Sequence, residues 1–265
     1  MEIPLAGGRA NQGAVVRIGD QVARPSYPQT PTVEHFMTYL RATLGDHVPQ
    51  VCGSDDAGRQ RLSYIEGRVP IAPHPPWAYD DDLLIDVARR QRQLHLAAQD
   101  YVAQPNAVWA VSAGDYFPPD AHGTLVCHND LGLANTIVHP DRPEVVGFID
   151  FDYSRPVDRL FDIAVAARHW VPFGSLDMAT PLDLDRVGRF HLFCDQHELS
   201  ANERCQVVDL AIGFLEHARS NIKNLAEQGK PGFAELIANG YEQTNIAIVE
   251  WIDQHREQLA LRTHG

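Results

Sequence analysis

Apolar and polar residues alternate over short distances in the first part of the chain, and this pattern predicts strands. Residues 13–24, GAVVRIGDQVAR, fit two short strands around a Gly-Asp turn. Residues 48–55 and 59–67 have the same character. Residues 30–44 instead place apolar side chains on one helical face, begin with Thr-Pro and stop before a glycine. We therefore expect a small strand-rich unit that contains one helix.

The pattern changes after a proline-rich stretch at residues 69–77, since proline disfavours helix interiors and central strands. Residues 80–101 have apolar side chains at helical spacing and aspartates at the start, where the helix dipole favours them. Short strands follow between residues 125 and 150. The chain after Asp152 is mostly helical, with a capping box before one helix and a last helix over about residues 233–261.

These elements predict an α+β fold with two lobes. A chain of 265 residues lies between one large domain and two ordinary ones. We assign residues 1–68 to a small β-rich N-terminal lobe, residues 69–79 to a linker, and residues 80–265 to a larger, mainly helical C-terminal lobe.

Composition narrows the class of protein. Apolar residues make up 44% and charged residues 22%, as in an average globular protein. The apolar runs are far shorter than the roughly 20 residues that span a bilayer, and the N-terminus has no secretory pattern. The four cysteines are widely spaced, which favours neither a zinc site nor a disulfide framework. We expect a cytoplasmic protein without a membrane partner.

The net charge of the chain indicates which kinds of molecule it can bind. A formal net charge of -13 argues against nucleic-acid binding, which usually requires a basic face. Most of the negative charge lies after residue 100, where its field would attract a cationic partner. The alternative is a solvated acidic surface that only helps solubility.

Polar side chains gather in residues 125–152, LVCHNDLGLANTIVHPDRPEVVGFIDFD. Asp130 and Asn135 bracket a loop between two predicted strands, and Asp150 ends the next strand, so a hairpin would bring the three together. A carboxylate and an amide oxygen from Asn135 and Asp150 suit Mg²⁺. Asp130 is then free to orient a hydroxyl and accept its proton, as phosphoryl transfer requires. Turn and cap residues are the alternative interpretation.

The spacing His128-x-Asp130-x4-Asn135 matches the kinase catalytic loop, and Asp150-Phe151-Asp152 stands where kinases have Asp-Phe-Gly. Without an Ala-Pro-Glu activation segment, the chain resembles the aminoglycoside phosphotransferase and choline kinase-like family, which has the protein kinase-like fold. The resemblance implies that Asp130 is the catalytic base, that Asn135 and Asp150 hold Mg²⁺, and that His128 braces the loop. It also implies a small-molecule substrate, and a buried Asp162 that supports the loop.

The resemblance places the nucleotide in the N-terminal lobe. Gly7 and Gly8 supply flexible backbone for a phosphate. The family's strand lysine is missing, because Lys223 and Lys230 are the only lysines, and Arg24 stands at its position. An arginine can bind phosphate through two nitrogens, and Glu34 is its only local acidic partner. The backbone of Ser63, Tyr64 and Ile65 resembles the hinge that reads adenine.

The leading hypothesis is an O-phosphotransferase that uses Mg²⁺ and either ATP or GTP on a small, hydroxylated, cationic acceptor. An aminoglycoside is the first substrate expected, and the modification would then give antibiotic resistance. Choline-like, amino-alcohol and sugar acceptors stay open, since tryptophans such as Trp109 and Trp170 suit a cation or a ring. A regulatory pseudokinase is the alternative that the missing lysine favours, and phosphate-ester hydrolysis is a third.

Overall fold

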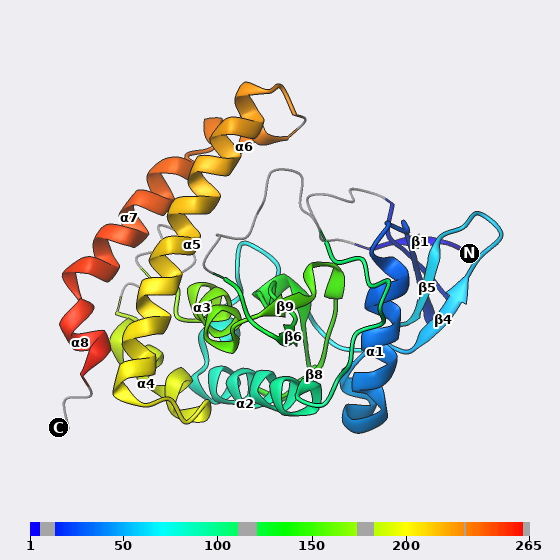
Figure 1. The fold of residues 1–265 in the computed structure, drawn as a ribbon, viewed down its shortest axis with the longest axis horizontal. Coiled ribbons are helices and arrows are strands. Elements are labelled where there is room, and N and C mark those ends of the chain that lie inside the picture. The colour runs from blue at the N-terminus through cyan, green and yellow to red at the C-terminus, as the bar shows by residue number, and fades with distance from the viewer. Residues whose placement is uncertain (6–13, 111–120, 174–182, 231, 262–265) are drawn as a thin grey trace.

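An antiparallel sheet of five short strands forms the N-terminal part of the molecule (Figure 1). The computed structural model describes residues 1–5, 14–110, 121–173, 183–230 and 232–261. Within them the strands are β1 (Ile3–Pro4), β2 (Val16–Ile18), β3 (Gln21–Arg24), β4 (Val51–Ser54) and β5 (Gln60–Ser63), in the order β1-β2-β3-β5-β4. The predicted strands are therefore confirmed, and β1 was not anticipated.

Helix α1 (Thr30–Leu44) lies between β3 and β4 in the chain and contacts β4, and helix α2 (Asp81–Ala98) follows β5 in the chain. Helix α1 has proline in its first turn, Gly45 at its C-cap with a positive φ of 61°, and a buried apolar face that includes Phe36 and Leu40. Helix α2 begins at Asp80, whose side chain accepts a hydrogen bond from the backbone N–H of Asp82 at 2.9 Å. Both helices agree with the sequence pattern.

Two small hairpin-like pairs lie at the centre of the molecule (Figure 1). Strand β6 (Leu125–Cys127) pairs with β9 (Arg155–Val157), and β7 (Thr136–Val138) pairs with β8 (Val145–Phe148), both antiparallel. The 3₁₀ turns η3 (Leu133–Asn135) and η4 (Phe151–Tyr153) flank the second pair. Strand β9 was missed by the sequence analysis, which expected helix after Asp152.

Helices make up the rest of the C-terminal part, at the opposite end of the molecule from the five-stranded sheet (Figure 1). They are α3 (Arg159–Trp170), α4 (Arg186–Gln196), α5 (Ala201–Glu227), α6 (Phe233–Ala238), α7 (Tyr241–Gln254) and α8 (Arg256–Ala260). The prediction of one last helix over residues 233–261 is wrong, because the chain breaks at Gly240, with φ 82°, and again at His255. The capping box of Ser200 and Glu203 is confirmed at the start of α5.

The β7–β8 pair forms hydrogen bonds both with the N-terminal part of the molecule and with helix α2. Arg68 and Val138 exchange two backbone hydrogen bonds of 2.8 Å. His47 Nδ1 lies 3.1 Å from the carbonyl oxygen of Val146. From the other side, Asp86 in α2 accepts the backbone N–H of Val145 at 2.7 Å. One hydrophobic core also runs from α1 through α2 and α3 to α4, so the β7–β8 pair is held between both parts.

No helix in the described part of the chain is both long and apolar enough to cross a membrane. A small β-rich N-terminal part followed by a larger helical part is the arrangement predicted from the sequence.

Candidate active site

The loop after β6 turns sharply at Asn129, which has a left-handed φ of 63°. Asparagine tolerates this conformation better than most residues because its short side chain can bond locally. The Asn129 Nδ2 donates to the carbonyl oxygens of Cys127 and Tyr153, both at 3.1 Å. Its side chain therefore ties the end of β6 to the start of β9, and the next residue, Asp130, is carried on a fixed turn. The sequence analysis did not assign this role to Asn129.

Asp162 also holds the loop after β6, through a hydrogen bond to its backbone. This aspartate in α3 is 1% exposed, and its Oδ1 accepts the backbone N–H of Asn129 at 2.6 Å. Its Oδ2 accepts hydrogen bonds from Gln91 Nε2 and from His95 Nε2, both at 2.7 Å. Burial alone would raise the pKa of Asp162, but the hydrogen bonds from His95 and Gln91 outweigh it and the pKa is lowered. The contact agrees with the loop-supporting role that the resemblance implied.

His128 connects the loop to the strand that leads to Asp150. Its Nε2 lies 3.0 Å from the carbonyl oxygen of Ile149, so this nitrogen bears the hydrogen and donates it. Its Nδ1 accepts the backbone N–H of Asp130 at 3.3 Å. Burial lowers the pKa of His128, which favours the neutral ring that both contacts require. These are the contacts of a histidine that braces the loop.

Asp130 and Asn135 are in direct contact. The Asn135 Nδ2 donates to the Asp130 carbonyl oxygen at 2.8 Å and to its Oδ2 at 2.9 Å. Burial, with the nearby charge of Asp150, raises the pKa of Asp130 to about 7, although Arg168 and the hydrogen bond from Asn135 act in the opposite direction. A carboxylate with this pKa can accept a proton near neutral pH.

Asp150 lies beside Asn135 because the backbone N–H of Ile149 donates to the Asn135 carbonyl oxygen at 2.9 Å. Asp150 has a left-handed φ of 64°, which turns the chain into η4. Its Oδ1 accepts a hydrogen bond from Arg24 Nη2 at 3.1 Å, and the same nitrogen contacts Asp152 Oδ2. The predicted trio of Asp130, Asn135 and Asp150 is thus gathered by the two strand pairs, although its catalytic and metal-binding roles stay predictions.

The donor atoms of Asn135 and Asp150 fit Mg²⁺. Both hydrogen bonds to Asp130 engage the Asn135 nitrogen, and the Asn135 Oδ1 accepts no hydrogen bond from the described residues. Asp150 Oδ2 likewise accepts no hydrogen bond from the described part of the chain. One amide oxygen and one carboxylate oxygen, with phosphate oxygens and water, complete the octahedron that Mg²⁺ prefers. Asn135 and Asp150 would hold the ion here.

A second cluster of potential metal ligands lies behind the loop, but its geometry does not suit a metal. The ligand atoms of His95, Cys127 and Asp162 are all within 4.8 Å of one another and are buried. Two ligand atoms that each lie about 2.0–2.2 Å from one metal ion are separated from each other by roughly 3 Å or more. The His95 nitrogen and the Asp162 oxygen are only 2.7 Å apart and are hydrogen-bonded to each other. Burial also raises the pKa of Cys127 well above its ordinary value, which disfavours the thiolate.

The prediction that Glu34 pairs with Arg24 is wrong. Glu34 Oε1 accepts a hydrogen bond from Gln60 Nε2 at 3.1 Å, whereas Arg24 contacts Asp150 and Asp152. The two carboxylates are more than 120 residues away along the chain, so the local sequence gave no signal of them. Whether Arg24 binds phosphate stays a prediction.

The residues predicted to contact the nucleotide are two glycines near the N-terminus and three residues that resemble a kinase hinge. Gly7 and Gly8 lie outside the described residues. Of the three residues that resemble a hinge, Ser63 donates its backbone N–H to Gln50 at 2.9 Å and Tyr64 donates its own to Asp20 at 2.8 Å. The Ile65 N–H has no acceptor among the described residues, and binding of an adenine edge by this segment stays a prediction.

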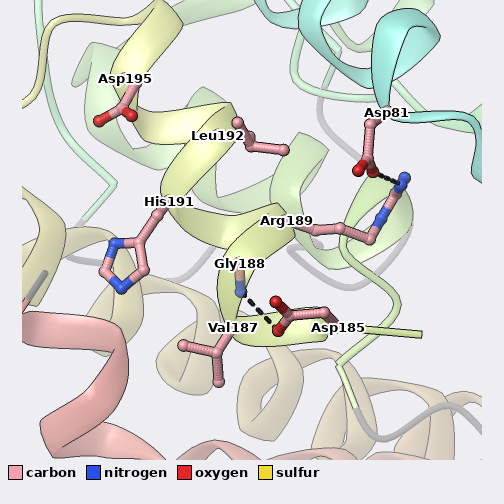
Figure 2. Close-up of a pocket in the computed structure, with 8 residues that line it drawn as sticks. All are labelled: Asp81, Asp185, Val187, Gly188, Arg189, His191, Leu192 and Asp195. Carbon is pink, nitrogen blue, oxygen red and sulfur yellow. Dashed lines mark hydrogen bonds and ion pairs between the residues drawn. The ribbon is translucent and has the colours of Figure 1, made fainter. Parts of the chain in front are cut away.

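A cavity of about 380 Å³ lies away from these residues, between the start of α2 and α4 (Figure 2). None of the predicted site residues lines it. At one edge the buried Arg189 contacts Asp81 at 2.6 Å, and its Nη2 donates to the Trp170 carbonyl oxygen at 3.0 Å. Trp170 Nε1 in turn donates to the Leu131 carbonyl oxygen at 3.1 Å. This wall of the cavity therefore supports the loop that contains Asp130.

Residues 65–179 match the sequence model of the phosphotransferase enzyme family. This span contains Asp130, Asn135 and Asp150, and it does not contain Arg24. A trifolitoxin immunity protein from Rhizobium leguminosarum bv. trifolii is 29% identical over 270 residues, which cover 97% of this chain and 97% of that protein.

Solved structures with the same fold come from small-molecule kinases. A choline/ethanolamine kinase family protein from Mesorhizobium loti has a TM-score of 0.66 and 18% identity, over 99% of this chain and 92% of that one. An aminoglycoside phosphotransferase from Streptomyces rimosus, in complex with ADP and streptomycin, has a TM-score of 0.53 and 18% identity, over 82% and 92% of the two chains.

The motif, the fold and the family match agree. The kinase spacing was recognised in the sequence, and the fold of the whole chain is that of the kinases just described. The protein therefore has the protein kinase-like fold, and its residues 65–179, which contain Asp130, Asn135 and Asp150, match the phosphotransferase enzyme family.

Proposed function

We propose that this protein is a kinase that transfers the γ-phosphoryl group of ATP, with GTP as the alternative donor, to a hydroxyl group of a small cationic molecule. The observation that supports it most is the contact of Asp130 with Asn135, whose two hydrogen bonds of 2.8 and 2.9 Å lie next to Asp150. This is a proton acceptor fixed beside two oxygen donors that fit Mg²⁺.

In the proposed reaction Asp130 accepts the proton of the acceptor hydroxyl. A bond forms between the hydroxyl oxygen and the γ-phosphorus, and the bond from that phosphorus to the β–γ bridging oxygen breaks. Asn135 orients the Asp130 carboxylate through its Nδ2. Mg²⁺ held by Asn135 and Asp150 would neutralise charge on the phosphates. Most of the rate enhancement then comes from positioning and electrostatics.

The proposal of a cationic acceptor is supported by the negative charge of the chain and by its structural relatives. Most of the net charge of -13 lies after residue 100, in the helical part that would bind the acceptor. One structural relative is in complex with ADP and streptomycin, and another belongs to a choline/ethanolamine kinase family. Aminoglycosides are therefore the first acceptors to test, followed by choline-like amines, amino alcohols and sugars.

Immunity to a toxin is a second candidate function. The immunity protein matches this chain over nearly its full length, including the regions on both sides of residues 65–179. Phosphorylation of a hydroxyl group on the toxin would connect that function with the kinase site, so trifolitoxin belongs in the acceptor panel.

The test is acceptor-dependent nucleotide consumption by the purified chain with Mg²⁺. We expect one acceptor class to stimulate turnover, and the Asp130→Ala variant to lose about 10²-fold to 10⁴-fold of it, the usual worth of a positioned general base. Asp141→Ala, at an exposed residue between β7 and β8, is the matched control and should keep wild-type turnover. Near-normal turnover in Asp130→Ala would remove Asp130 from the mechanism. Nucleotide binding without turnover on any acceptor would favour a regulatory pseudokinase.

A further inference from the structure

Arg24 places a positive charge between two carboxylates of the candidate metal site. Its Nη2 contacts Asp152 Oδ2 and lies 3.1 Å from Asp150 Oδ1. The Arg24 side chain is only 8% exposed, and those of Asp150 and Asp152 are 36% and 17% exposed. Water screens the contact with the mostly buried Asp152 only weakly, and the contact with the more exposed Asp150 to a greater degree. The guanidinium charge competes with any cation that approaches the two carboxylates.

Some N–H donors of the Arg24 guanidinium form no hydrogen bond with the described residues. Both carboxylate contacts involve the same nitrogen, Nη2. The Arg24 Nε is buried and has no partner among the described residues. An arginine offers five N–H donors in a planar fork that suits two oxygens of one phosphate. Nη1 is not among the buried atoms and forms no hydrogen bond with the described residues, so Arg24 keeps a donor that an anion can bind without a change in its charge.

We propose that Arg24 occupies the place of a divalent cation at Asp150 and Asp152 until nucleotide binds, so that the metal enters only together with the nucleotide. This inference rests on the proposed kinase function. Without nucleotide, the guanidinium neutralises one of the two carboxylate charges and repels an incoming dication. With nucleotide, the phosphates attract the Arg24 fork, and Asp150 is released to the metal. A permanently charged arginine makes this coupling stronger than a lysine would, because burial can neutralise a lysine.

The test uses Mn²⁺ as the probe and measures free Mn²⁺ by electron paramagnetic resonance, with the full chain and without any acceptor. The wild type should bind Mn²⁺ weakly alone and tightly with ADP. The Arg24→Gln variant should bind Mn²⁺ without nucleotide at least about tenfold more tightly than the wild type, since a unit charge a few ångströms away is removed. Adding Asp150→Asn to that variant should abolish the gain.

Arg61→Gln is the matched control for removing a positive charge from this sheet. Arg61 lies on β5, next to β3, and its Nη2 donates to Gln21 Oε1 at 2.8 Å. Because this arginine bonds an amide and not Asp150 or Asp152, its removal should leave nucleotide-free Mn²⁺ binding at the wild-type level. A gain as large as that of Arg24→Gln would show a general effect of net charge and overturn the proposal.

Other outcomes separate this inference from the kinase proposal. A wild type that binds ADP and turns over acceptor, with no gain of nucleotide-free Mn²⁺ binding in Arg24→Gln, overturns the inference and leaves the kinase function standing. A wild type that binds no nucleotide refutes the kinase function itself. If Arg24→Gln does not fold, Arg24→Met removes the same charge with a side chain of similar length, and nucleotide-free Mn²⁺ affinity equal to that of the wild type again overturns the inference.

Discussion

Replacing Asp162 by alanine removes the acceptor of three hydrogen bonds that meet beneath the catalytic loop. The donors are the Asn129 backbone N–H at 2.6 Å, and Gln91 Nε2 and His95 Nε2 at 2.7 Å. Gln91 is fully buried, and His95 is 6% exposed, so water cannot readily replace the lost carboxylate. The variant therefore leaves buried polar groups without partners, in addition to a small void.

The expected loss of stability follows from these donors. Each buried donor left unpaired costs about 1–3 kcal/mol, and the side chains of Gln91 and His95 can partly reorient. We expect Asp162→Ala to lower the free energy of unfolding by roughly 3–6 kcal/mol, a large part of the roughly 5–15 kcal/mol that is typical of a domain. Asp158→Ala removes only the N-cap of α3, a 2.8 Å bond to the Leu160 N–H, and should cost about 0.5–2 kcal/mol.

Urea unfolding of the wild type and the two variants, followed by circular dichroism, measures the difference. The folded-state pKa of Asp162 is lowered from its ordinary value of 3.8, so its contribution is complete above that pH and is lost as the pH falls through the folded-state pKa. The gap between wild type and Asp162→Ala should thus be constant near neutral pH and shrink in acid. If Asp162→Ala were as stable as Asp158→Ala, the hydrogen-bond argument would be refuted.

Three further predictions concern the site. In the metal-free protein Asp130 should titrate near neutral pH, because burial and the charge of Asp150 raise its pKa to about 7; an NMR carboxyl titration of the wild type against Asp130→Asn that finds no group titrating near 7 would contradict this. Asp150→Ala should weaken Mg²⁺-dependent ADP binding in calorimetry, and an unchanged metal requirement would count against its assignment. Trp170→Phe removes the bond to the Leu131 carbonyl oxygen and should lower the urea midpoint by the equivalent of about 1–2 kcal/mol; an unchanged midpoint would mean that this bond contributes no net stability.

Elements with a clear period were predictable from the sequence. The face of α1 and its Pro31 and Gly45 boundaries were visible in residues 30–45, because a helix of four turns repeats its apolar positions several times. Strand β9 has only three residues, with Pro156 in the middle, and pairs with β6 alone. A strand so short has no period to detect, and a proline in it argues against a strand.

The break in the last helix did leave a local signal. Asn239 and Gly240 interrupt the apolar pattern, and Gly240 has the positive φ that glycine permits. The apolar residues on both sides keep a helical spacing, which by itself predicts one continuous helix.

The residues of the candidate site were predictable as a set, but their mutual contacts were not. The spacing from His128 to Asn135 is local, and a hairpin places Asp150 next to it. The contact of Arg24 with Asp150 and Asp152 joins segments that no turn or period relates, so it depends on how the sheet packs on the helical part. From the sequence alone we therefore expected Glu34, the only acid in the following helix, as its partner.

The β7–β8 pair also has a mechanical consequence. Asn135 directly precedes β7 and Asp150 follows β8 by two residues. Arg68 and His47, from the N-terminal part, and Asp86, from α2, hold this pair. We expect any opening between the two parts of the molecule to pivot about this pair. Residues at a pivot move least, so the metal ligands would keep their distance from Asp130 while the strands that face the nucleotide swing. The open and the closed enzyme would then share one preassembled metal site.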